Sequence, residues 1–157
     1  MIPDISILLS DFLMVVDLAG VNMSRNALSF EILSAPHKPP SSLPKGMMAI
    51  YIFQWKGECL KVEKVGPNSQ ARYTSQHYSP SSSNSNLAKS IVSAREKLGL
   101  SGVSESNVGA WIKSNVDRIN ILIDSKCGIP VLTLCESFFQ CRLRPRFEGF
   151  ESQKMGG

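Results

Sequence analysis

The chain has 157 residues, of which 43% are hydrophobic and 19% are charged, and it carries a net charge of +4. This length allows one domain with its own buried core, and the composition is typical of a globular protein rather than a disordered or fibrous one. The positive charge is compatible with an anionic partner such as nucleic acid.

The first apolar segment does not have the features of a targeting signal. Residues 5–20 lack a basic leading region, and Asp11 and Asp17 interrupt them. No apolar run approaches the length of a membrane span. The four cysteines form no Cys-x-x-Cys pair, so we expect reduced thiols rather than a zinc site. These features predict a cytoplasmic protein with no membrane partner.

The N-terminal third is expected to be helical and then extended. Apolar residues recur at helical spacing over residues 4–18, which predicts an amphipathic helix. A second short helix is predicted over residues 24–33. We therefore define residues 1–34 as an N-terminal helical arm. Residues 35–46 form a Pro-rich linker, because prolines are excluded from helix interiors and central strands.

The rest of the chain alternates strands and helices. Strands are predicted over residues 47–54, 59–65 and 117–124, and the first two form a hairpin around the turn "KGE". In the second strand the apolar side chains are expected on one side, and Lys61, Glu63 and Lys64 on the other. Helices are predicted over the following ranges: 86–98, 107–115 and 128–143.

These elements predict an α/β fold. The expected core is a small three-stranded, largely antiparallel sheet flanked by helices, with the N-terminal arm as a helical extension. The domain spans residues 47–150, and residues 151–157 form a flexible tail.

Several polar side chains interrupt apolar or loop segments. Tyr51 lies inside the apolar strand "AIYIF", and a nearby lysine ammonium would lower the pKa of its phenol. Arg72 and His77 follow: on a helix they would lie on different faces, and on a loop they can converge. An arginine can bind a phosphate through two hydrogen bonds, and a histidine titrates near neutral pH. Glu136 lies in an apolar helix, where a carboxylate needs a partner. Each also has an ordinary reading, as a satisfied core or surface residue.

The order of these residues resembles the GIY-YIG nuclease superfamily over residues 46–148. The triplet Ala49-Ile50-Tyr51 corresponds to the first motif, with alanine in place of glycine. The triplet Lys61-Val62-Glu63 corresponds to the second, with lysine in place of tyrosine and glutamate in place of glycine. The bulk and negative charge of Glu63 are expected to reduce activity.

The resemblance implies a metal-dependent endonuclease that hydrolyses phosphodiester bonds of DNA. Glu136 would bind Mg²⁺ or Mn²⁺, and Arg72 would neutralise charge on the phosphate. Tyr51 would orient or deprotonate the attacking water, helped by the basic residues Lys61, Lys64 and His77. RNA is not excluded as a substrate, and cleavage of both strands would favour a homodimer.

Two other functions stay open. The first is a catalytically impaired module that keeps the GIY-YIG fold and binds nucleic acid without cleaving it. The second is a structural or interaction protein that recruits a partner through its N-terminal helix.

Overall fold

The structure, a computed structural model, describes residues 4–147. The predicted tail over residues 151–157 and the end of the predicted domain at residue 150 lie outside the described residues.

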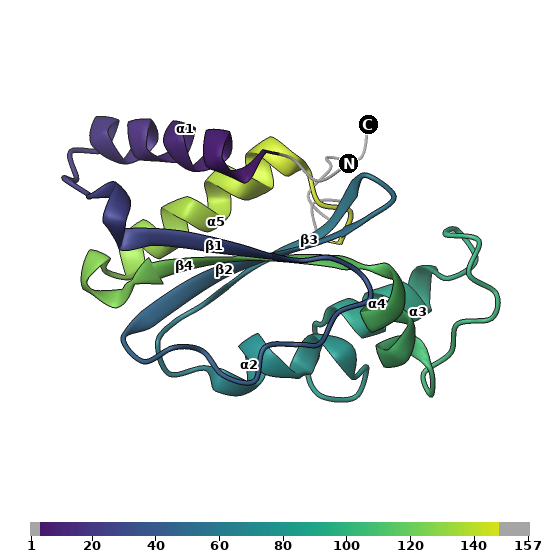
Figure 1. The fold of residues 1–157 in the computed structure, drawn as a ribbon. Coiled ribbons are helices and arrows are strands. Elements are labelled where there is room, and N and C mark those ends of the chain that lie inside the picture. Colours follow the sequence, from purple (N-terminus) through teal and green to yellow (C-terminus); the bar gives the residue numbers. More distant parts are fainter. Residues whose placement is uncertain (1–3, 148–157) are drawn as a thin grey trace.

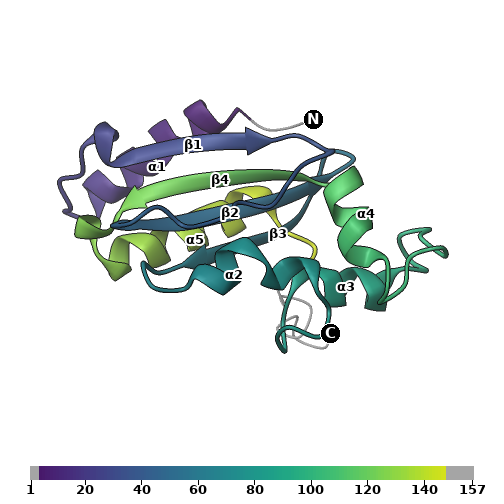
Figure 2. The same cartoon turned by 60° about the horizontal axis from the view of Figure 1, so that its bottom comes forward.

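A four-stranded antiparallel sheet forms the centre of the described chain (Figure 2). Its strands, in the spatial order β1-β4-β2-β3, are β1 (Leu28–Leu33), β4 (Asp117–Asp124), β2 (Met47–Trp55) and β3 (Glu58–Val65). The three predicted strands are present, and β1 makes the sheet one strand larger than expected. The predicted second helix over residues 24–33 is therefore wrong. A short 3-10 helix (Arg25–Ala27) is followed by β1, which pairs with β4.

Helices cover both faces of the sheet (Figure 1). One layer contains α1 (Ile5–Leu18) and α5 (Ile129–Leu143). The other layer contains α2 (Gln70–Thr74), α3 (Leu87–Ala94) and α4 (Val108–Asn115), with a 3-10 helix (Gln76–Tyr78) after α2. A further 3-10 helix (Ser125–Cys127) precedes α5, and its Cys127 packs on the core of the α1–α5 side. The mixed helix and strand content confirms the α/β prediction.

The helix α1 belongs to the core on its face of the sheet. Asp4 caps its N-terminus by accepting a hydrogen bond from the Ile7 amide at 3.2 Å. Its buried stripe includes Leu9 and Phe12, which are 0% exposed and pack with residues of β2, β4 and α5. The first 34 residues thus contribute one helix and one edge strand to the same sheet and core.

The register of the β2–β3 hairpin decides which side each functional residue faces. Tyr51 lies opposite Glu63, and Ile50 lies opposite Lys64. Since side chains alternate along a strand, Lys61 and Glu63 face the layer of α2 and α3. Lys64 faces α5 instead, together with Val62. The expectation that all three charged residues share one side is therefore wrong for Lys64.

The hairpin turn explains part of this register. Lys56 and Gly57 both have positive φ, 51° and 76°, which is the conformation of a tight two-residue turn that matches the twist of the strands. A bulge between Phe53 and Gln54 then adds one residue to β3. The bulge allows both Leu60 and Lys61 to be buried.

Over the described residues, none of the helices combines the length and the apolar character that a membrane crossing requires.

Candidate functional site

The centre of the candidate site is a hydrogen-bonded pair between β2 and the 3-10 helix after α2. The phenol oxygen of Tyr51 lies 3.0 Å from Nε2 of His77 and donates to the backbone carbonyl of Arg72 at 3.3 Å. On the other side of the ring, Nδ1 of His77 accepts from the Leu87 amide at 3.1 Å. Because Nδ1 is an acceptor, the neutral imidazole carries its proton on Nε2, which donates to Tyr51.

Burial sets the protonation of this pair. Tyr51 and His77 are both 0% exposed. Burial, together with the neighbouring charges of Arg72, Lys61 and Arg118, lowers the pKa of His77 to about 2. Burial, followed by the negative charge of Glu63, raises the pKa of Tyr51 far above its ordinary value. The prediction that lysines lower the pKa of Tyr51 is therefore wrong. The cations that oppose the shift are Arg72 and Arg118, and the penalty for burying a phenolate is larger than their effect.

Glu63 joins two cations of the site. Its Oε1 lies 2.9 Å from Nζ of Lys61, and its Oε2 lies 2.9 Å from a guanidinium nitrogen of Arg72. The side chains of Lys61, Glu63 and Arg72 are 3%, 12% and 30% exposed. Burial opposes the charge of Arg72, but the hydrogen bond and the charge of Glu63 outweigh it and raise the pKa of Arg72. A lysine and an arginine from two elements thus converge on the two oxygens of one carboxylate.

The second ion pair approaches from the opposite layer. Lys64 on β3 donates to Oε1 of Glu136 on α5 at 2.7 Å. Although this pair faces α5, the negative charge of Glu136 contributes to the raised pKa values of both Tyr51 and Arg72. Charges on the two faces of the sheet can affect each other here because β3 is the edge strand of the sheet.

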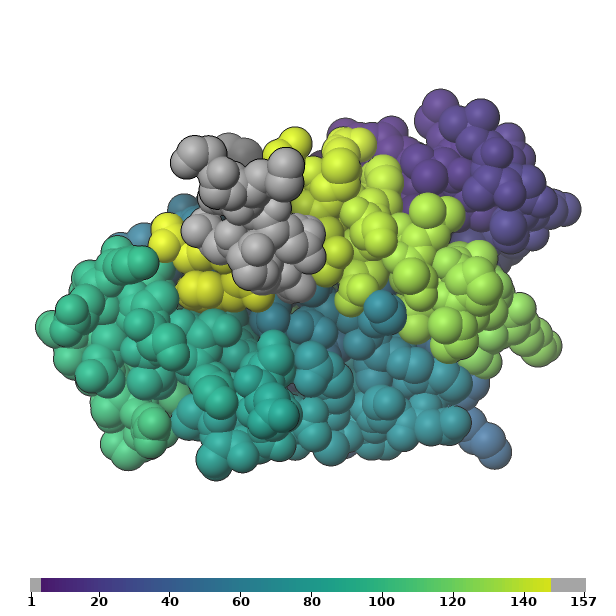
Figure 3. Space-filling view, turned by 180° about the vertical axis from the view of Figure 1, so that it is seen from behind, coloured from purple at the N-terminus to yellow at the C-terminus, as the bar shows by residue number. Residues whose placement is uncertain are grey.

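Four of the six residues proposed from the sequence therefore form one contact network: Tyr51, Lys61, Arg72 and His77. Lys64 and Glu136 form a separate pair on the other side of β3. Figure 3 shows the molecule from behind, where the blue residues around β3 and α2 border the teal-green region of α3 on one side and the yellow-green helix α5 on the other.

A divalent metal ion would find a sparse set of protein ligands here. Within residues 4–147, no three His, Cys, Asp or Glu side chains gather closely enough to hold a metal ion. Glu136 offers one carboxylate, of which Oε1 is bound to Lys64, and its side chain is 15% exposed. Magnesium is often bound by one or two carboxylates, with waters and substrate phosphates as the remaining ligands. A metal ion held by Glu136 would therefore need waters and a substrate phosphate as its other ligands, because the described residues form no all-protein cage.

Arg118 is an important residue of this region that the sequence did not single out. It is 0% exposed, and its guanidinium donates to Asn120, Tyr78 and the Tyr73 carbonyl. Its charge also lies 4.8 Å from the ring centre of Tyr51. The only signal in the sequence was an arginine within the apolar strand "RINILID", where burial of the charge was not expected.

Comparisons with protein-family models, curated proteins and solved structures found no match.

Proposed function

We propose that this protein hydrolyses phosphodiester bonds of DNA with the help of a divalent metal ion, Mg²⁺ or Mn²⁺, in the manner of GIY-YIG nucleases. The observation that supports this most is the position of the Glu63 carboxylate between Lys61 and Arg72. Both cations point at two oxygens of one anion, and a phosphate presents paired anionic oxygens in a similar way. In this proposal the carboxylate of Glu63 holds the place of the substrate phosphate.

In this proposal each side chain has a role that its contacts support. Lys61 and Arg72 hold the scissile phosphate and offset the charge that grows on it during hydrolysis. Tyr51 keeps its proton, because burial raises its pKa, so it does not deprotonate the attacking water. Its buried hydroxyl instead donates to the backbone carbonyl of Arg72 and so positions the segment that carries this cation. His77 stays neutral and holds the phenol oxygen through its Nε2 proton.

Glu136 is the residue that would hold the metal ion, with Lys64 fixing its carboxylate. When bound there, the ion supplies positive charge for the phosphate and its leaving oxygen. The pair also brings a further cation, Lys64, to the edge of the site.

A second candidate is a module that binds DNA without cleaving it, and the ion pairs of Glu63 favour it. They neutralise the two cations that would bind phosphate, and the side chain lies opposite Tyr51 on the same face of the hairpin. Both candidates predict DNA binding, and only the first predicts that removal of Glu63 releases cleavage.

A plasmid-nicking assay with Mg²⁺ or Mn²⁺ distinguishes them. Wild type, Glu63→Gly, Glu136→Ala and the double variant are compared, with Glu105→Gly as the control because Glu105 is exposed and is not part of the site. We expect slow nicking by wild type, faster nicking by Glu63→Gly, and loss of nicking in both variants that lack Glu136.

Undiminished nicking by Glu136→Ala would contradict the metal assignment. Binding without nicking in both wild type and Glu63→Gly would support the second candidate.

An RNA substrate in the same assay tests the choice of DNA. Because one site cuts one strand, linearised product would support the proposed homodimer, whereas nicked circles indicate that one copy acts alone. A cytoplasmic location is part of the proposal.

A further inference from the structure

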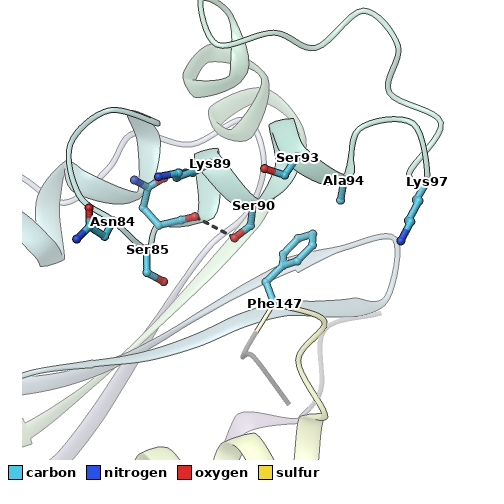
Figure 4. Close-up of a pocket in the computed structure, with 9 residues that line it drawn as sticks. Asn84, Ser85, Lys89, Ser90, Ser93, Ala94, Lys97 and Phe147 are labelled. Carbon is cyan, nitrogen blue, oxygen red and sulfur yellow. Dashed lines mark hydrogen bonds between the residues drawn. The ribbon is translucent and has the colours of Figure 1, made fainter. Parts of the chain in front are cut away.

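A pocket of about 380 Å³ lies beside the proposed site, between α3 and the segment that follows α5 (Figure 4). Pockets that bind small ligands typically measure about 300–1,000 Å³. Polar residues from the end of the serine-rich loop and from α3 form one wall, and Phe147 forms the other. In Figure 4 the ring of Phe147 lies across from Ser90, Ser93 and Ala94.

Backbone hydrogen bonds to β3 fix the position of Phe147. The Phe147 amide donates to the Leu60 carbonyl at 2.9 Å, and the Arg146 amide donates to the Cys59 carbonyl at 3.0 Å. Arg146 is also ion-paired with Glu58 at 2.8 Å. These contacts attach the segment to β3, so the half-buried ring is a preorganised wall rather than a loose side chain.

Both walls of the pocket are connected to the proposed phosphate-binding cations. Nζ of Lys61 donates to the Phe147 carbonyl at 3.1 Å. A guanidinium nitrogen of Arg72 donates to the Ser85 carbonyl at 3.4 Å. The pocket is therefore the immediate neighbour of the place where Lys61 and Arg72 hold an anion.

The chemistry of the walls suits a nucleotide. Lys89 and Lys97 are exposed cations on the α3 side, and no carboxylate is among the described residues that line the pocket. Ser85 and Asn84 offer neutral hydrogen-bonding groups at its rim. An aromatic face next to a cationic track is the combination by which proteins bind single-stranded nucleic acids, with the bases stacked on the rings.

We propose that this pocket binds one unpaired nucleotide next to the scissile phosphate, with its base against Phe147 and its neighbouring phosphates near Lys89 and Lys97. The proposal rests on the proposed function, since it assigns the neighbouring nucleotide of the same substrate. A paired base is stacked inside the duplex and cannot reach the ring, so the preferred substrate is single-stranded DNA or DNA with an unpaired nucleotide at the cleavage point.

The test is fluorescence anisotropy of labelled oligonucleotides in EDTA, which separates binding from cleavage. Phe147→Leu keeps an apolar side chain against the core and removes the aromatic face, whereas Phe147→Tyr keeps the ring. We expect Phe147→Leu to weaken single-strand binding by about 5- to 100-fold, the range for loss of one base–aromatic stack, and Phe147→Tyr to bind like wild type. Duplex binding should change little in either variant.

Two further experiments locate the nucleotide in the pocket. An abasic site moved along the oligonucleotide should weaken wild-type binding at one position and have no added effect in Phe147→Leu. Lys97→Gln should reduce the salt dependence of binding by about one counterion, whereas Lys45→Gln, an exposed lysine before β2, should reduce it less.

The outcomes separate this inference from the proposed function. Equal binding of single strands by wild type and Phe147→Leu overturns the nucleotide pocket and leaves the nuclease proposal standing. Binding that depends on Phe147, without nicking by wild type or Glu63→Gly, supports the pocket and overturns the nuclease proposal. Nicking by a protein that does not bind single strands overturns the pocket alone.

Discussion

Glu63 is the residue on which the proposed chemistry most depends. Its carboxylate contacts Lys61 and Arg72 at 2.9 Å each, and the three side chains are largely shielded from solvent. An ion pair in such a place compensates charges that would otherwise attract a polyanion. A change of this one side chain should therefore alter the affinity for DNA more than a change of any exposed charge.

Glu63→Gln removes the negative charge and keeps the size of the side chain. We expect tighter DNA binding with a salt dependence steeper by about one or two counterions, because the negative charge beside Lys61 and Arg72 is removed. Anisotropy titrations at several salt concentrations measure this, with Glu105→Gln, an exposed glutamate, as the control. Equal affinities and slopes for wild type and Glu63→Gln would contradict the assignment of these two cations.

The lowered pKa of the buried His77 makes the stability of the fold depend on pH. Its folded-state pKa of about 2 lies below the ordinary value of 6.5, so between these values the unfolded chain binds a proton that the folded protein does not. The free energy of unfolding should therefore fall as the pH is lowered through this window, by at most about 1.4 kcal/mol per pH unit. This contribution is fully present above about pH 6.5.

Urea unfolding at about pH 7 and about pH 5 tests this. The free energy of unfolding should be lower at the lower pH, by no more than the limit per pH unit given above. His77→Gln keeps a donor toward Tyr51 but does not titrate, so it should lose less stability between the two pH values than wild type. An imidazole resonance of His77 that titrates near pH 6.5 would show that the ring is not buried as described.

At the scale of elements, Arg118 connects β4 to the segment that carries the site residues. Its guanidinium donates to the carbonyl of Tyr73 on α2 at 2.6 Å and to Oδ1 of Asn120 at 2.7 Å. The same α2 segment supplies Arg72, and the 3-10 helix after it supplies His77. One buried cation thus holds the sheet against the elements that position the candidate site.

Arg118→Met keeps a similar length and removes the donors, so three buried acceptors lose a hydrogen bond: the Tyr73 carbonyl, Oδ1 of Asn120 and the hydroxyl of Tyr78. We expect a loss of at least about 2 kcal/mol in the free energy of unfolding, since each unsatisfied group costs about 1–3 kcal/mol. Arg118→Lys should recover part of this loss, because the charge and one donor remain. Arg95→Met, an exposed change on α3's C-terminal cap, should stay within about 0.5 kcal/mol of wild type, and an equal loss there would contradict the assignment.

At the scale of the whole molecule, two cores on opposite faces of one sheet share the strands β2 and β3. The site lies at β3, where the α2–α3 layer supplies Arg72 and His77 and the α5 layer supplies Glu136. The helix α1 belongs to the core on the α5 side. Loosening α1 should therefore destabilise the entire fold rather than detach an N-terminal segment.

Phe12→Ala tests this integration. Phe12 is 0% exposed, and we expect a loss of about 3–5 kcal/mol, whereas Met14→Ala at 66% exposure should cost less than about 0.5 kcal/mol. Far-ultraviolet circular dichroism and the fluorescence of Trp55 and Trp111, whose rings meet edge to face with centroids 5.3 Å apart on the other side of the sheet, should report one shared unfolding midpoint. Separate midpoints for the two signals would indicate that α1 unfolds independently.

Local patterns were sufficient to predict most elements of the fold. The amphipathic spacing of α1, the apolar β2, the hairpin turn and the helix α5 are visible in the sequence because each depends on neighbouring residues. The types of residue that gather at the site, including Tyr51 and Arg72, also followed from their unusual positions in apolar or loop segments.

Long-range contacts decided the rest. Residues 28–33 form a strand because β4, about ninety residues later, supplies hydrogen-bonding partners. Pairing and burial decided that Lys64 faces α5 and that Tyr51 keeps its proton. The carboxylate of Glu63 lies between two cations because β3 packs beside α2. Charge and protonation at this site depend on which groups are brought together, and no local pattern in the chain specifies that.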